Sequence, residues 1–98
     1  MTAGSKMTVT PDGDGSFRVD ICGTSGTTSH TVRATPATAG DLGWSGSVAE
    51  LVRQSFEFLL EREPQTSILR DFDLEVIGRY FPDYPREIRR RSAGRQSS

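Results

Sequence analysis

The sequence predicts an α+β domain, in which a small antiparallel meander of two or three strands packs on one long helix followed by two or three short helices. Apolar and polar residues alternate within residues 7–35, as in half-buried strands, whereas after Ser47 the apolar residues recur at helical spacing. The 98 residues suffice for one domain with a modest core. Most of the aromatic side chains that would stabilise this core fall in the second half: Phe56, Phe58, Phe72, Tyr80, Phe81 and Tyr84.

Composition and patterning divide the chain into three parts. Residues 1–6 are expected to be a flexible N-terminus, residues 7–91 a single domain, and residues 92–98 a disordered basic tail. Within the domain, residues 7–35 form the β meander and residues 47–91 the helical half.

The alternation predicts two or three antiparallel strands. Met7 and Val9 alternate with threonines, and the turn sequence PDGDGS (11–16) separates them from the next strand. The following two strands are expected to pair around a four-residue loop, 24–27, in the register that joins their apolar faces: Phe17 with Ala34, Val19 with Val32 and Ile21 with His30. A sheet this small needs a helix against it.

One long helix is expected to begin at Ser47, whose side chain can cap the backbone of Glu50, and to end before Pro64. The Gly-rich segment 36–46 before it is interpreted as a connection that keeps Leu42 and Trp44 at the edge of the core. The apolar arc of the helix spans roughly half its circumference, wider than the ~100° stripe that one contact needs. The helix should therefore pack on the sheet and also on later helices or a second subunit.

The segment SILRDFDLEVIGRYFP (67–82) is expected to form two short helices around a turn capped by Asp73, with the apolar side chains inward and Pro82 as the stop. A helix-turn-helix that reads DNA is the alternative. The second helix would then present Asp71, Asp73 and Glu75 to phosphates, which disfavours binding. A last helix should follow, with Asp83 as cap and Tyr84 and Ile88 inward.

No residue set predicts catalysis, so we expect neither an enzyme nor a cofactor or metal. The turn DGDGS lacks the Gly and the Glu that a calcium loop requires, since Phe17 and Gly23 stand there. Cys22 and His30, the sole cysteine and histidine, fall on opposite faces of the expected sheet, His30 half-buried and Cys22 a small apolar filler. The acids that remain are interpreted as a solvated face: Glu61, Glu63, Asp71, Asp73, Glu75 and Asp83.

The net charge is −1, but basic residues gather near the end of the chain. Lys6 is the only lysine, and this preference for arginine indicates a GC-rich, bacterial genome. The arginines could contact a partner or an anion, or they could simply favour the dipole at a helix C-terminus. The candidate contact residues are Arg86, Arg89, Arg90, Arg91 and Arg95.

The rest of the composition indicates a reduced, cytoplasmic setting without membrane contact. A single cysteine cannot form an intrachain disulfide, and no apolar run is long enough for a signal peptide or for a membrane span.

The blocks FEFLLERE, SIL, FDL and RYFP within residues 55–85 resemble blocks in short uncharacterised prokaryotic proteins, where they follow a small β-rich start. No activity, ligand or catalytic residue is known for that group. The resemblance covers about a third of the chain, and it implies only that the helical half is a recurrent unit.

We expect a non-enzymatic protein-interaction module, for which a homodimer is one form, because the helix arc is wide and no catalytic set is present. The alternative is an accessory nucleic-acid-binding protein that uses the arginine-rich C-terminal segment.

Overall fold

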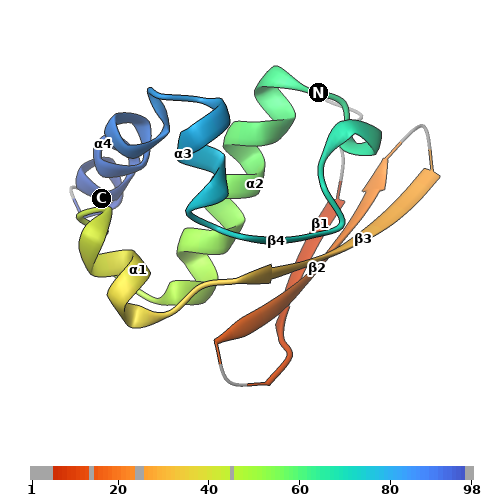
Figure 1. Ribbon diagram of the computed structural model, residues 1–98, viewed down its shortest axis with the longest axis horizontal. Helices are drawn as coiled ribbons and strands as arrows, with labels where there is room; N and C mark the ends of the chain where they lie inside the picture. The colour runs from red at the N-terminus through yellow and green to blue at the C-terminus, as the bar shows by residue number, and fades with distance from the viewer. Residues whose placement is uncertain (1–5, 14, 24–25, 45, 97–98) are drawn as a thin grey trace.

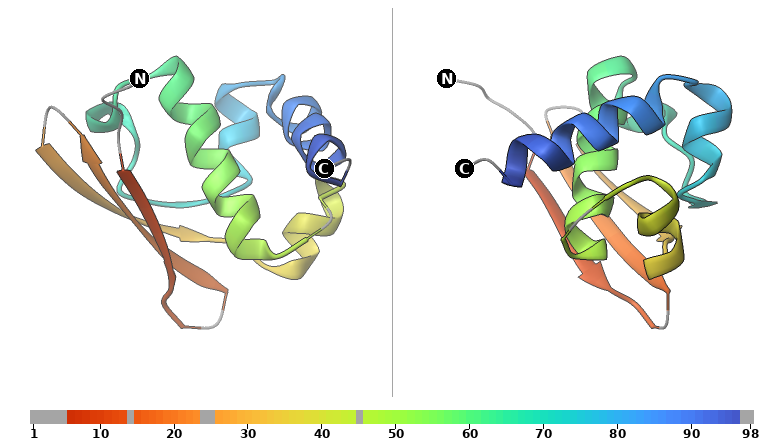
Figure 2. Two further views of the ribbon diagram at one scale, coloured as in Figure 1. Left: turned by 180° about the vertical axis from the view of Figure 1, so that it is seen from behind. Right: turned by 90° about the vertical axis from the view of Figure 1, so that its left-hand side faces the viewer.

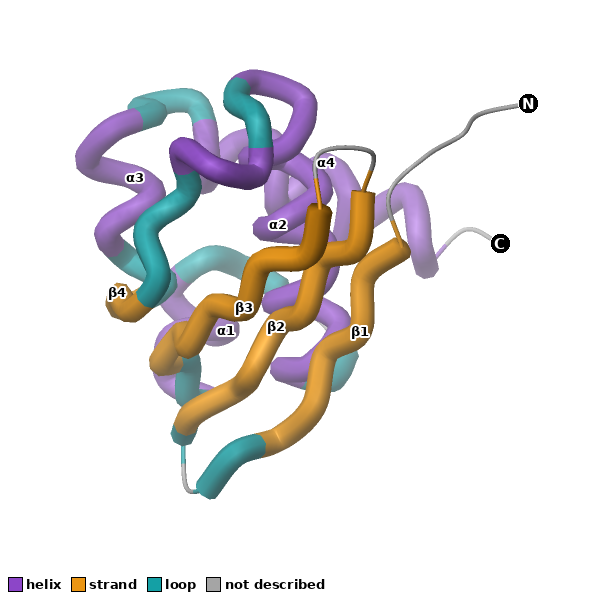
Figure 3. Tube along the Cα trace, turned by 90° about the vertical axis from the view of Figure 1, so that its right-hand side faces the viewer, coloured by secondary structure: helices purple, strands orange, loops and turns teal. Residues whose placement is uncertain are grey.

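The computed structural model describes residues 6–13, 15–23, 26–44 and 46–96, with side chains as far as Ser92. Within these residues, a twisted sheet forms one layer, and the four helices lie on one side of it (Figure 1). Among the described residues, no helix lies on the other side of the sheet, as seen when the sheet is turned toward the viewer (Figure 3). The α+β class is therefore as predicted.

The sheet has four strands in the order β1-β2-β3-β4. The first three, β1 (Lys6–Pro11), β2 (Ser16–Gly23) and β3 (Gly26–Arg33), form the predicted antiparallel meander. The fourth, β4 (Asp71–Asp73), pairs with β3 in parallel, so the sheet is mixed and not purely antiparallel. Lys6, expected in the flexible N-terminus, already belongs to β1, while residues 1–5 lie outside the described part of the chain.

The expected register of β2 and β3 is wrong by two residues. Val19 pairs with His30 and not with Val32, and the hairpin closes at Gly23 and Gly26 around residues 24–25 instead of 24–27. Gly26 has a φ of 119°, a backbone conformation that favours glycine and suits a shorter connection. Because the shift is an even number of residues, the same side chains still face the helices.

The inner face of the sheet is a set of rows that run across the strands. Val9, Val19 and His30 form one row, and Phe17, Val32 and Phe72 form another. Val19 and Val32 are fully buried beneath the helices. The alternation therefore determines which faces join, although it does not determine the pairing.

A short helix, α1 (Pro36–Asp41), replaces the expected Gly-rich connection. Thr35 and Thr38 cap its start reciprocally, and Pro36 supplies the fixed φ of a first helical residue. Leu42 and Trp44 are buried as expected, and the Trp44 indole donates a hydrogen bond to the Ser47 carbonyl (3.0 Å).

The long helix α2 (Val48–Arg62) has the predicted bounds. The hydroxyl of Ser47 accepts a hydrogen bond from the backbone of Glu50 (3.1 Å), and the helix ends before Pro64. Its wide apolar arc packs on β1 and β2 at one flank, and on α1 and the last helix, α4 (Tyr84–Gln96), at another (Figure 2). This chain therefore buries most of the arc itself, and the arc no longer indicates a second subunit.

Of the two helices expected around Asp73, the second is present in shortened form as α3 (Val76–Tyr80), whereas the first is replaced by a 3₁₀ turn, η1 (Gln65–Ser67), and then β4. The amide of Thr31 donates to the Arg70 carbonyl (2.6 Å) and the amide of Leu74 to the Arg33 carbonyl (2.9 Å), so this stretch is held as an edge strand. Pairing with a distant strand overrides the local preference. A helix-turn-helix is therefore excluded for this segment.

The last helix, α4 (Tyr84–Gln96), buries Tyr84 and Ile88 as predicted. It extends through residues 92–96, which were expected to be a disordered tail, and residues 97–98 lie outside the described chain. Within the described residues, no helix has the length and apolar character needed to cross a bilayer.

Candidate functional site

Cys22 and His30 do not form a catalytic pair. As predicted, they lie on opposite faces of the sheet, but Cys22 is exposed and does not fill space in the core. The His30 side chain is buried, with only 2% exposed, and not half-buried. The sequence was therefore right about the faces and wrong about the two environments.

Both ring nitrogens of His30 are bonded. Nδ1 lies 2.8 Å from the carbonyl oxygen of Leu69, which can only accept, so Nδ1 carries a proton and donates. In the neutral ring, Nε2 then accepts from the Thr28 hydroxyl at 2.9 Å. The side-chain amide of Gln65 donates to the same hydroxyl oxygen at 3.2 Å and to the Ile21 carbonyl at 3.2 Å. His30 is thus a structural bridge between β3 and the chain that leads to β4.

Most of the acidic residues that were predicted to form a solvated face are paired with arginines. Arg33 binds Asp71 (2.8 Å) and Asp73 (2.5 Å) at the edge of a polar notch beside α1, and these hydrogen bonds raise the pKa of Arg33. Asp73 is therefore an ion-pair partner, where the sequence predicted a helix cap. No group of three or more metal-ligating side chains within the described residues is placed to hold an ion.

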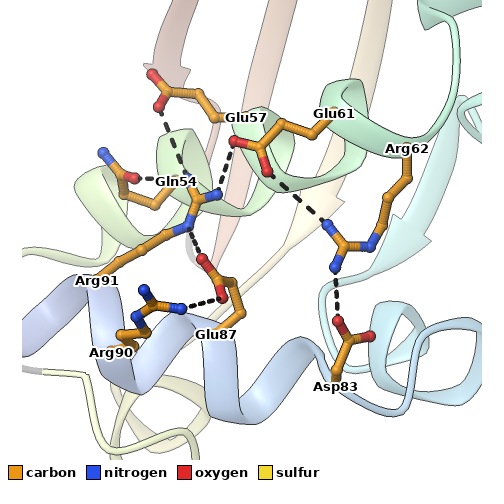
Figure 4. Close-up of polar contacts among 8 residues, drawn as sticks. All are labelled: Gln54, Glu57, Glu61, Arg62, Asp83, Glu87, Arg90 and Arg91. Atoms are coloured by element: carbon orange, nitrogen blue, oxygen red, sulfur yellow. Dashed lines mark hydrogen bonds and ion pairs between the residues drawn. The ribbon is translucent and has the colours of Figure 1, made fainter.

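An ion-pair network joins α2 to α4 (Figure 4). The Arg91 guanidinium donates to Glu61 (2.8 Å), to Glu87 (3.2 Å) and to Gln54 (3.2 Å), and only 17% of its side chain is exposed. Arg91, one of the five predicted contact residues, is therefore committed to the fold.

A second arginine extends the same network. Arg62 binds Asp83 at 2.6 Å, approaches Glu61 at 3.8 Å and stacks over the ring of Phe58 at 3.9 Å. The Asp83 carboxylate, predicted as a cap, is held by this arginine. Glu61 lies between both guanidinium groups in Figure 4, so one acid on α2 links two partners.

Beneath the network lies a buried hydrogen bond. The hydroxyls of Ser55 on α2 and Tyr84 on α4 are 2.6 Å apart, and Ser55 also donates to the Leu51 carbonyl at 2.8 Å. Burial raises the pKa of the Tyr84 phenol well above its usual range, against a smaller lowering by the hydrogen bond with Ser55. The contact between α2 and α4 is therefore held by a hydrogen bond in the core and by ion pairs at the surface.

Of the other predicted contact residues, three remain exposed on α4. Arg86, Arg89 and Arg90 are spaced three and four residues apart, so they share one helix face. The Arg90 side chain is 81% exposed and lies 3.7 Å from Glu87. The side chain of Arg95, the fifth predicted residue, lies outside the described part of the structure.

An apolar groove of about 410 Å³ opens between the C-terminal end of α2, the chain from η1 to β4, and α3. In Figure 1, β4 and the chain leading to it pass in front of α2, with α3 beside them. The groove walls are mostly buried apolar side chains: Leu59, Ile68, Phe72, Val76, Ile77 and Phe81.

Two exposed side chains and one acid border this apolar groove. Leu69 is 49% exposed and Tyr80 67% exposed, and these are the large apolar residues that the described chain leaves in solvent. Both were predicted to point inward. Glu63 is half-buried at the groove, and among the described residues its carboxylate has no hydrogen bond or ion pair. The groove therefore combines unsatisfied apolar surface with an unpaired negative charge.

This groove could not be predicted from the sequence as long as every apolar residue after Ser47 was expected in the core. A usable signal was the adjacent pair Ile68 and Leu69. Neighbouring residues of an extended chain point to opposite sides, so only one of the two can face the core once this stretch is a strand-like segment.

Comparison with known proteins adds no family to this description. No family model matches the chain, and neither the curated proteins nor the solved structures yield a match. The resemblance of residues 55–85 to short prokaryotic proteins stays a prediction, and the groove and the exposed arginines of α4 are the candidate sites.

Proposed function

We propose that this protein is a non-enzymatic protein-interaction module that binds a polypeptide segment in the apolar groove. The observation that supports the proposal is the exposure of Leu69 and Tyr80 beside a cavity lined by buried apolar side chains. Exposed apolar surface that borders a concavity is typical of an interaction site. The width of the α2 arc, which first suggested an interaction, no longer supports it.

The geometry is unlike that of a catalytic pocket. Glu63 is the one ionisable acid or base at the groove besides the phenol of Tyr80, and the buried histidine is bonded at both nitrogens elsewhere. General acid–base or nucleophilic catalysis needs a second positioned group within hydrogen-bond reach. Binding is thus the simplest role, and the free Cys22 fits our proposal of a reduced, cytoplasmic location.

Selection of peptides from a random twelve-residue library displayed on phage tests this proposal. Wild-type protein should enrich peptides with a bulky apolar anchor, and those peptides should lose binding to the variants Leu69→Asp and Tyr80→Ser. Asp20→Ser, a change on the open face of the sheet, is the matched control and should bind them normally. Enriched peptides that bind all variants equally would place the interaction elsewhere, and selection without any enrichment would argue against the module.

A second candidate is an accessory nucleic-acid-binding protein that uses the exposed face of Arg86, Arg89 and Arg90. Three phosphate contacts would make binding weaken steeply between 50 mM and 200 mM salt. A fluorescence-anisotropy titration with labelled duplex and single-stranded DNA measures this. Replacement of the three arginines by glutamine should abolish binding at the lower salt concentration. Unchanged binding by that variant, or no binding by the wild type, would rule the candidate out.

A further inference from the structure

We infer that the segment that occupies the apolar groove belongs to a second copy of this chain, and that a twofold axis through the groove pairs Glu63 of each copy with Arg79 of the other. The inference rests on the proposed function and names its partner. It follows from the acid that lines the groove, from the arginines next in sequence to the exposed groove residues, and from the elements that carry these charges.

The chain next to the groove carries positive charges that the groove lining lacks. Each of the two exposed groove residues has an arginine next to it in the sequence, since Arg70 follows Leu69 and Arg79 precedes Tyr80. Both arginines are exposed, and neither has a hydrogen bond or an ion pair from its side chain among the described residues. The unpaired acid, Glu63, lies at the same groove. The chain around the groove therefore carries apolar anchors with a positive charge next to them in the sequence, and the groove lining carries a negative charge.

The placement of these groups suits a twofold interface. Glu63 follows the last residue of α2 on one side of the groove, whereas Arg79 and Tyr80 end α3 on another side. Both helix ends lie toward the top of Figure 1. A twofold axis exchanges the two sides, so that Arg79 of one copy faces Glu63 of the other and Tyr80 meets the opposite groove. Such an isologous contact is self-complementary and occurs twice.

Charge complementarity favours this occupant over an unrelated apolar peptide. An apolar segment without a cation would bury the Glu63 carboxylate without a partner, which is costly. A second copy supplies the missing cation together with the apolar side chain. Two exposed anchors per copy form a small contact, so we expect a weak, reversible dimer and not an obligate one.

Sedimentation equilibrium of the full chain tests the inference, over concentrations from roughly 10 µM to roughly 1 mM, where weak interfaces associate. Wild type should approach the mass of two chains. Glu63→Lys places like charges together, and so does Arg79→Glu, so either substitution should weaken the dimer at least tenfold, to about 10 times the wild-type dissociation constant or more. Arg18→Glu makes the same charge change on the open face of the sheet and should dimerise as the wild type does.

The decisive sample is an equimolar mixture of the Glu63→Lys and Arg79→Glu proteins. In the mixed dimer, the introduced lysine of one copy would face the introduced glutamate of the other, and the unchanged Arg79 would face the unchanged Glu63. Both contacts are then restored, and the dimer mass should return. That recovery also shows that both variants are folded.

Three results would overturn the inference: a wild type that stays monomeric over the whole range, a dimer that tolerates either single substitution, or a mixture that stays monomeric. In each of these cases the phage selection decides the proposed function separately. Groove-dependent peptides would preserve the interaction module with another partner, and their absence would remove it.

Discussion

The two flanks of α2 reach the surface in different ways. On the side of α4, the apolar packing includes the buried Ser55–Tyr84 hydrogen bond and is covered by the ion pairs of Arg91 and Arg62. On the side of α3, the apolar packing ends in an open groove with Leu69 in solvent. One helix thus carries a flank that the chain closes itself and a flank that it leaves open. The first flank is expected to contribute to stability, whereas contact with another molecule at the second is our proposal.

The largest effect on stability is expected when a side chain is removed from the closed flank, the one that packs on α4. Tyr84→Ala should lower the free energy of unfolding by about 3–5 kcal/mol, because it opens a cavity beside Phe58 and deletes a buried hydrogen bond. A small domain has only about 5–15 kcal/mol in total, so much of its stability would be lost. Urea denaturation measures the change, and a loss below about 1 kcal/mol would mean that α4 contributes little to the core.

A milder change, Tyr84→Phe, removes the hydroxyl and keeps the ring, so it measures the contribution of the hydroxyl to stability. At pH 8 the variant should lose about 1 kcal/mol, the usual contribution of one hydrogen bond, since Ser55 keeps its bond to the Leu51 carbonyl.

The sign of the effect should reverse in alkali. The folded pKa of Tyr84 is raised by burial, whereas the unfolded chain releases this proton near pH 10. The stabilisation is therefore complete below about pH 10 and falls above it, by up to about 1.4 kcal/mol per pH unit. Denaturation in urea at several pH values should show the wild type losing its advantage over Tyr84→Phe near pH 11. A constant difference across that range would contradict the buried, neutral phenol.

The ion pairs at the surface should contribute less than the packing beneath them. Arg91→Met keeps most of the aliphatic stem and removes the charge, which should cost about 1 kcal/mol because Arg91 is partly buried and has three partners. Arg90→Met is the matched control on the same helix, and its loss should stay within about 0.5 kcal/mol. Equal losses, or a loss at Arg91 that high salt does not reduce, would contradict an electrostatic contribution.

The sequence predicted the closed flank better than the open one. Alternation identified the inner faces of β1–β3, and the signals at Ser47 and Pro64 gave the bounds of α2, because both are local patterns. The contacts that join Arg91 to α2 could not be predicted, since Gln54 and Glu61 lie 37 and 30 residues away along the chain. The register failed for a related reason, because alternation cannot distinguish pairings that differ by two residues.

The open flank was mispredicted because its structure depends on distant pairing. Residues 71–73 contain the strand that adds to β3, yet their surroundings have the spacing of short helices. Only the edge of an already formed sheet makes the extended conformation the better one. Once that strand forms, Phe72 turns inward while Leu69 stays in solvent, and the groove appears as a consequence.

The smallest effect on stability is expected at the open flank itself. Leu69→Ser and Tyr80→Ser replace exposed side chains, so the free energy of unfolding should change by less than about 0.5 kcal/mol for each. Ile77→Ala, at a buried position in the wall of the same groove, is the contrast and should cost about 2–5 kcal/mol. Urea denaturation at low protein concentration, where a weak dimer is dissociated, gives all three values. A large loss of unfolding free energy at Leu69 or Tyr80 would show that these side chains stabilise the monomer. The proposed difference between the two flanks of α2 would then be wrong.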